Sequence, residues 1–91
     1  MSERVDQVRK DNTRKAVMEL AALYYNSNWV GFRDTEELTR MEGYTKLSRS
    51  ELDAAIDTIR GRYGYYCAIS YTFDPCDMFL MINVKEREYG N

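Results

Sequence analysis

The stretch Ser48-Arg49-Ser50-Glu51-Leu52-Asp53-Ala54-Ala55-Ile56-Asp57-Thr58-Ile59-Arg60 carries the clearest local signal in the chain. Ser48 followed by Glu51 is the pattern of a capping box, in which the two side chains satisfy unpaired backbone N–H groups at the start of a helix. The apolar residues that follow recur at helical spacing on one side, and they are Leu52, Ala55, Ile56 and Ile59. The sequence therefore predicts a helix over residues 49–60, ended by Gly61 and Gly64.

Beyond this helix the apolar residues alternate, as they do in strands with one buried face. A first strand would bury Tyr65, Cys67, Ile69, Tyr71 and Phe73, and a second would bury Met78, Leu80, Ile82 and Val84. The segment Asp74-Pro75-Cys76-Asp77 between them is a turn signal. The predicted register of this hairpin pairs Phe73 with Met78, Tyr71 with Leu80, Ile69 with Ile82, and Cys67 with Val84. Cys67 and Cys76 then lie too far apart for a disulfide, and two free thiols are expected.

Three further elements are predicted upstream of residue 48. A long helix over residues 3–25 is indicated by the helical spacing of its apolar residues, which are Val5, Val8, Ala16, Leu20, Leu23 and Tyr24. Asn26-Ser27-Asn28 would end it, because such side chains compete for backbone hydrogen bonds. Residues 29–32 read as a brief strand. Asp34 or Thr35 then caps a second helix over residues 35–42, which stops at Gly43.

The composition is that of one folded domain. The chain has 91 residues, of which 44% are hydrophobic and 31% charged, so it can bury a core and is not expected to be disordered. We expect a single domain over residues 1–91, with frayed ends at 1–3 and 86–91. No run reaches the roughly 18 apolar residues of a membrane span. The first ten residues lack the apolar core of a secretory signal, which makes a cytoplasmic location the expectation.

The order of these elements is long helix, short strand, helix, turn, helix and hairpin, and it resembles the winged helix-turn-helix superfamily. Thr35-Glu36-Glu37-Leu38 opens the positioning helix of that motif, Gly43 marks its turn, and residues 47–52 open its recognition helix. Residues 65–84 would be the wing. The resemblance implies an α+β fold class, a small winged helix-turn-helix domain with a long helix, a short strand, two helices and a C-terminal β-hairpin wing.

The resemblance also implies a DNA-binding protein, a transcriptional regulator that acts as a dimer. The third helix of the superfamily commonly enters the major groove of double-stranded DNA. Arg49 and Ser50 would lie at the start of that helix, where Arg49 could reach a guanine. Lys46, Arg60 and Arg62 would contact phosphates. The net charge of −2 weighs against this function, because nucleic-acid binding usually draws on a basic surface.

A second hypothesis is a module that binds protein. Asp53 and Asp57 face outward on the predicted third helix, where they would repel phosphates, and Tyr66, Phe79 and Met81 lie on the hairpin face that is expected to be wet. The first helix, a second copy of the chain or a partner protein would have to cover these apolar side chains. A small acidic inhibitor or adaptor of a host protein complex, of the kind that phages and other mobile elements encode, fits these features.

Catalysis is not expected from the residue types present. The chain has no histidine, which is the commonest general base and metal ligand. Its two cysteines lack the spacing of a zinc pair, and Gly61-Arg62-Tyr63-Gly64 lacks the lysine of a phosphate loop. The expectation is therefore no enzymatic activity, no metal and no cofactor. A smaller alternative is binding of single-stranded nucleic acid by the arginine and tyrosine cluster at Arg60, Arg62, Tyr63, Tyr65 and Tyr66.

Overall fold

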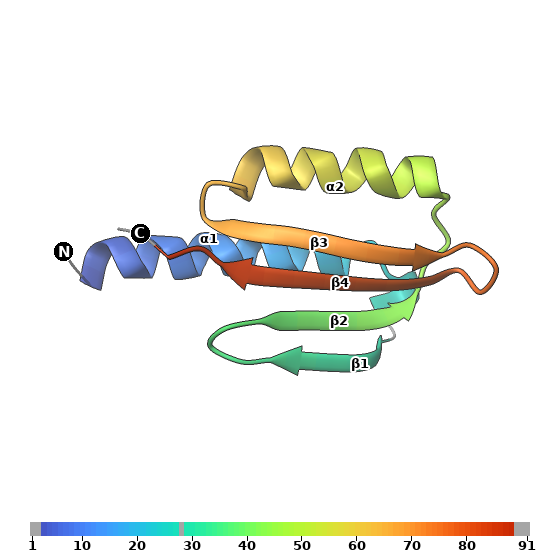
Figure 1. Cartoon of the computed structure of the whole chain (residues 1–91), viewed down its shortest axis with the longest axis horizontal. Coiled ribbons are helices and arrows are strands. Elements are labelled where there is room, and N and C mark those ends of the chain that lie inside the picture. The colour runs from blue at the N-terminus through green and yellow to red at the C-terminus, as the bar shows by residue number, and fades with distance from the viewer. Residues whose placement is uncertain (1–2, 28, 89–91) are drawn as a thin grey trace.

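The fold is an α+β arrangement of two α-helices and a four-stranded antiparallel sheet (Figure 1). The computed structural model describes residues 3–27 and 29–88. The elements in chain order are helix α1 (Glu3–Ala21), the 3-10 turn η1 (Tyr25–Ser27), strands β1 (Trp29–Asp34) and β2 (Thr39–Tyr44), helix α2 (Arg49–Tyr63), and strands β3 (Cys67–Asp74) and β4 (Phe79–Glu86). The sheet order is β1-β2-β4-β3, so two hairpins lie side by side and β1 and β3 are the outer strands.

Both helices belong to one layer, which leaves the other face of the sheet open. Helix α1 packs against β4 and against α2, and α2 packs against β3. Figure 1 looks onto the opposite face, where none of the described helices lies in front of the strands. The N-terminal part of α1 extends past the end of the sheet. The fold thus presents one side of the sheet as a broad surface.

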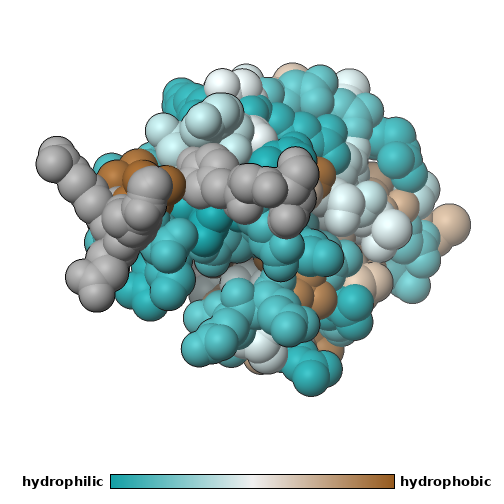
Figure 2. Space-filling model, turned by 60° about the vertical axis from the view of Figure 1, so that its left-hand side comes forward, coloured by the Kyte–Doolittle hydropathy of each residue, from teal (hydrophilic) through white to brown (hydrophobic). Residues whose placement is uncertain are grey.

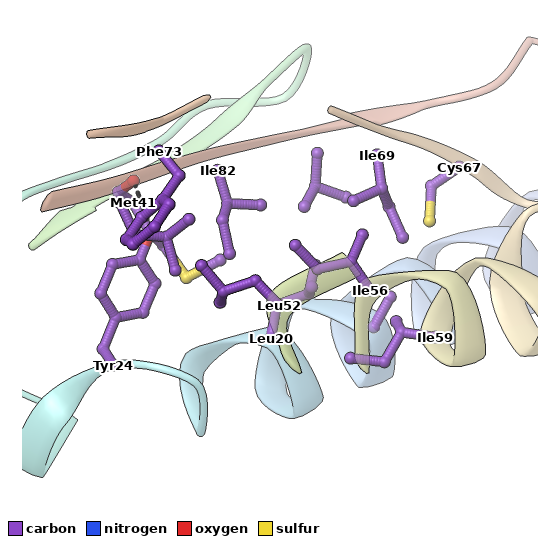
Figure 3. Close-up of a cluster of buried hydrophobic side chains, with 13 residues drawn as sticks. Leu20, Tyr24, Met41, Leu52, Ile56, Ile59, Cys67, Ile69, Phe73 and Ile82 are labelled. Carbon is purple, nitrogen blue, oxygen red and sulfur yellow. Dashed lines mark hydrogen bonds between the residues drawn. The ribbon is translucent and has the colours of Figure 1, made fainter. Parts of the chain in front are cut away.

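The core lies between the sheet and the helices. Residues of β2, β3 and β4 that alternate along each strand point toward α1 and α2 (Figure 3). The fully enclosed side chains come from every layer, and they are Ala16, Leu20, Met41, Leu52, Ile56, Leu80 and Ile82. Tyr24 is also buried, and its hydroxyl donates a hydrogen bond of 2.8 Å to the backbone oxygen of Met41. A buried phenol that found no acceptor would cost about 1–3 kcal/mol, so this bond fixes the turn after α1 over β2.

The predicted capping box of α2 is confirmed. The backbone N–H of Glu51 donates to Ser48 Oγ at 3.3 Å, and the backbone N–H of Ser48 donates to Glu51 Oε1 at 2.9 Å. The second bond, from the backbone N–H of Ser48, stabilises the ionised carboxylate and is the largest cause that lowers the pKa of Glu51. The helix runs beyond Gly61 to Tyr63, and Gly64 is its C-cap. The predicted apolar stripe is also confirmed at Leu52, Ile56 and Ile59, which are buried.

The predicted helix over residues 35–42 is wrong, because this segment forms the turn and second strand of a hairpin. The backbone N–H of Thr35 donates to the backbone oxygen of Leu38 at 2.9 Å, and the Thr39 hydroxyl donates to Asp34 Oδ1 at 2.8 Å. Residues 39–44 then pair with β1 on one side and β4 on the other. Gly43 does not end a helix but is buried inside β2. The order of helices and strands therefore differs from that of the winged helix-turn-helix.

The first helix is shorter than predicted. It ends at Ala21 instead of Tyr25, and residues 22–24 continue as a turn with Tyr24 held under the sheet. Asn26 adopts a left-handed conformation with φ 54°, but it lies in η1, five residues beyond the end of α1, so it does not end this helix as predicted. Asn28 lies outside the described residues. The strand predicted at residues 29–32 is confirmed and extends to Asp34.

The C-terminal hairpin forms, but its register differs from the predicted one by two residues. Phe73 pairs with Leu80, Tyr71 with Ile82, Ile69 with Val84, and Cys67 with Glu86. The turn occupies residues 75–78, because Pro75 cannot donate a ladder hydrogen bond and Met78 takes a left-handed conformation with φ 56°. A shift of two keeps the predicted inward face, although Tyr65 precedes β3 and is 72% exposed instead of buried. Glu86, expected to fray, belongs to β4.

Candidate functional site

Two of the arginines predicted to contact DNA form hydrogen bonds with the backbone of the outer strand β3. Arg49 Nη2 donates to the backbone oxygen of Phe73 at 3.1 Å, and its guanidinium carbon lies 5.5 Å from the centre of the Phe73 ring. Arg60 Nε and Nη2 both donate to the backbone oxygen of Ile69, at 3.1 and 2.8 Å. Carbonyls on an outer strand invite pairing with another chain, and these two side chains satisfy them.

The other predicted DNA contacts also have partners within the chain. Arg62 forms an ion pair with Glu19 of α1, and Tyr63 donates a hydrogen bond to the same carboxylate, which raises the pKa of Tyr63. Lys46 Nζ lies 4.0 Å from the centre of the Tyr25 ring. The hydroxyls of Ser48 and Ser50 are 3.3 Å apart. The structure thus places the five predicted DNA-contact residues around α2, and it gives each one a structural contact.

The residues predicted for a protein interface fall into two groups on different layers. Asp53 and Asp57 are exposed on α2, where Asp57 lies 3.4 Å from Arg60. Phe79 and Met81 lie on β4 with side chains on the uncovered face of the sheet, because their neighbours Leu80 and Ile82 point into the core. Tyr66 precedes β3, and its ring and that of Tyr65 meet edge to face at 5.2 Å between centres. These residues do not form one surface.

The uncovered face of the sheet, which we call the open face, gathers side chains from all four strands. The register places them in rows across the sheet. The first row is Tyr44, Phe79 and Asp74; the second is Gly31, Glu42, Met81 and Thr72; the third is Arg33, Arg40, Asn83 and Ser70; and the fourth is Lys85 and Ala68. Tyr44 of β2 thus lies on the same face as Phe79 and Met81, the two apolar side chains that are predicted to point toward solvent.

An aromatic pair occupies one end of the open face. The rings of Tyr44 and Phe79 meet edge to face with 5.3 Å between their centres. Tyr44 is 49% exposed, although Phe79 and Met81 are partly covered by their neighbours in the sheet. Large apolar side chains that adjoin on an open sheet surface are typical of a surface that contacts another macromolecule.

The charges of the open face are segregated along the strands. The carboxylates of Glu42 and Asp74 lie in the first two rows, which we call the acidic end. The cations lie in the last two rows, which we call the basic end, and they are Arg33, Arg40 and Lys85. Arg40 Nε donates to Asn83 Oδ1 at 2.9 Å, so its hydrogen-bond partner on this face is neutral. The open face therefore has an electric polarity along its strands.

A groove lies at the other side of the molecule, between α1 and the turn of the first hairpin. Its volume is about 660 Å³, and it has basic side chains on the helix wall (Lys10 and Arg14) and acidic ones on the turn (Glu36 and Glu37). The Thr13 hydroxyl donates to a backbone oxygen of α1, and that of Thr39 to Asp34. Figure 2, which brings the α1 N-terminal end forward, shows a mostly hydrophilic surface with small, separate apolar areas.

The two cysteines are free, as predicted, with Cys67 buried and Cys76 exposed in the turn between β3 and β4. Burial raises the pKa of the Cys67 thiol, so it resists ionisation. Within residues 3–27 and 29–88, no cluster of three or more histidine, cysteine or acidic side chains is arranged to hold a metal ion. Over the same part of the chain, none of the helices is long and apolar enough to span a membrane.

Sequence reasoning missed four residues of the open face: Arg33, Arg40, Glu42 and Tyr44. The last three belong to β2. Arg40 and Glu42 fall in the segment predicted as a helix, which would have placed them on different sides of it, and Tyr44 falls in the predicted turn. Their one signal in the sequence is the alternation of Thr39, Met41 and Gly43 with these residues, and it is too weak to indicate a strand because Met41 is its one large apolar side chain.

The chain was compared with protein-family models, with curated proteins and with solved structures, and no match was found in any of the three comparisons.

Proposed function

We propose that this protein is a protein-interaction module that binds its partner through the open face of the sheet. The observation that carries the proposal is the aromatic pair of Tyr44 and Phe79, which adjoins Met81 on a face that no described helix covers. A module of this kind would act as an adaptor or inhibitor, since its contribution is a shaped surface and not a reaction.

The composition of the open face supports protein as the partner. Aromatic residues, methionine and arginine are enriched in protein interfaces, and the open face holds Tyr44, Phe79, Met81, Arg33 and Arg40. Regular strands also fix the backbone positions from which these side chains project, which lowers the backbone entropy that is lost on binding. A broad sheet surface suits contact with another folded surface better than capture of a small molecule, which favours a concave site.

DNA binding stays a prediction, and the contacts of α2 favour protein over DNA. The arginines that would contact DNA bind Phe73, Ile69 and Glu19 of the same chain. Moving them onto phosphates would leave the carbonyls of β3 and the carboxylate of Glu19 without these partners. The exposed carboxylates of Asp53 and Asp57 would also repel a phosphate backbone on that side of α2.

The proposal is tested by photo-crosslinking in the native cells. A photoreactive phenylalanine analogue replaces Met81 on the open face, and a matched variant carries it at Thr58, which is exposed on α2. We expect a defined protein adduct from position 81 and none from position 58. Adducts from position 58 alone, or no adduct from either position in folded protein, would contradict the proposed surface.

A further inference from the structure

We infer that the open face binds a second copy of this chain, turned so that the acidic end of one face lies on the basic end of the other. The inference rests on the proposed function, because it names the partner of the same surface. It is carried by the distribution of charge on the four strands, which is independent of the aromatic pair.

The basic end holds two arginines that oppose each other across the strands. Arg33 of β1 pairs directly with Arg40 of β2. Like charges placed directly opposite on a sheet are destabilising. Among the described residues neither arginine forms an ion pair, and the hydrogen bond that Arg40 makes is to the neutral amide of Asn83. A carboxylate from outside the chain would relieve this repulsion.

The acidic end supplies such a carboxylate. Glu42 lies in the row next to Arg40 on the same strand, and within the described part of the chain it too has no ion pair. Its neighbours across the strands are Gly31 and Met81, which carry no charge. The face therefore bears the two halves of an ionic contact that is not completed within one chain.

A two-fold axis between two chains forms the ionic contact twice, once at each end of the paired faces. If the axis lies between the two sheets, parallel to their planes, and runs across the strands, it reverses the strand direction and sets each acidic end on the partner's basic end. Each strand then lies on its own copy, so Glu42 faces the partner's Arg40. A two-fold contact is self-complementary by construction, so one arrangement satisfies both ends together. An axis that runs along the strands would instead place like ends on each other, where Arg33 and Arg40 would face arginines again. The charge pattern selects the first arrangement, with Phe79 and Met81 buried between the two sheets.

The arrangement is tested by charge exchange, measured by sedimentation equilibrium. Two variants, Glu42→Arg and Arg40→Glu, each place like charges at both ionic contacts of the dimer. We expect each variant alone to raise the dimer dissociation constant roughly tenfold or more. An equimolar mixture should associate again, because the arginine introduced at position 42 then meets the glutamate introduced at position 40, while the native pair forms at the second contact. Circular dichroism and thermal unfolding verify that both variants fold.

Asp53→Arg is the matched control, since it reverses a charge on α2 and should leave association unchanged. Wild-type protein that stays monomeric at about 1 mM, variants that associate normally, or a mixture that stays monomeric would each overturn the inference. The proposed function can fail separately. If the protein is monomeric but position 81 still yields an adduct with a different protein, the dimer is refuted and the proposed surface stands. If position 81 yields no adduct in cells, both are refuted.

Discussion

The ring of Tyr44 meets the ring of Phe79 edge to face, with 5.3 Å between their centres and 74° between their planes. The two residues are cross-strand partners of β2 and β4, in the middle of the sheet. An aromatic pair of this geometry contributes about 0.5–1.5 kcal/mol beyond the area that it buries. Tyr44 stays half exposed within the pair. We therefore expect the pair to contribute more to binding, when a partner covers it, than to folding.

Replacing Phe79 by alanine should therefore weaken association much more than folding. We expect the free energy of association to fall by about 1–3 kcal/mol, as for a central aromatic residue of an interface. Phe32→Ala is the control, because Phe32 is also exposed but pairs with Met41, whose side chain points into the core from the helix side of the sheet. Sedimentation equilibrium of both variants measures the effect. Equal loss of association in the two variants would contradict the assignment of the surface to the open face.

Tyr24→Phe should destabilise the fold by about 1–2 kcal/mol, because the backbone oxygen of Met41 loses its donor in a buried place. Urea denaturation measures the free energy of unfolding. Tyr25→Phe serves as a matched control at the next residue, where the ring is exposed and its contact with Lys46 uses the ring face. The role of Tyr24 would be refuted by equal stability of Tyr24→Phe and wild type.

Alkaline pH should destabilise the protein through Cys67. Burial raises the pKa of this thiol in the folded state above its unfolded value of about 8.5. The folded chain then holds the proton more tightly, so the stabilisation is complete below about pH 8.5 and is lost as the pH rises from there. The free energy of unfolding, measured by denaturation at several pH values, should fall less steeply with rising pH in Cys67→Ala than in wild type. The exposed Cys76→Ala variant should keep the wild-type slope, and a wild-type slope in both variants would argue against this cause.

Random-sequence duplex DNA should not bind with micromolar affinity even at low salt. The reason is that Arg49, Arg60 and Arg62 are held by contacts within the chain and that exposed carboxylates lie beside them on α2. Fluorescence anisotropy over a series of salt concentrations measures this. Micromolar binding that weakens steeply with salt would show that the cations act together on phosphates, and it would favour the regulator over the interaction module.

The sequence predicts the parts of this fold whose signals are local and redundant. The helix α2 combines a capping box with a one-sided apolar stripe, and both signals agree. The strands β3 and β4 carry alternating apolar residues, which fix the buried face but not the register. A register shift of two residues preserves that face, so the position of the turn decides the register. In this turn Met78 takes a left-handed conformation, which methionine rarely adopts, so its residue type does not indicate the turn.

The strand β2 could not be predicted from its own residues. Met41 is its one large inward side chain, since Thr39 and Gly43 fill the other inward positions, and a single apolar residue carries no period. Thr35-Glu36-Glu37 resembles the start of a helix, but here the Thr35 hydroxyl and backbone close a turn onto Leu38. The same error concealed most of the candidate site, because Arg40, Glu42 and Tyr44 reach the open face only when residues 39–44 are extended. Phe79 and Met81 were found because their strand was predicted correctly.

Oxidative footprinting of methionines tests the central claim most directly, since it reports whether anything covers the open face without requiring the partner to be known. Met81 lies on that face, and Met18 on α1 is 73% exposed and serves as the internal reference. The ratio of Met81 to Met18 oxidation is measured in the native cells and again in purified protein at high dilution. We predict that dilution raises this ratio several-fold, because the partner that covers Met81 dissociates. An identical ratio in both conditions would show that the open face is bare in the cell and would contradict the account.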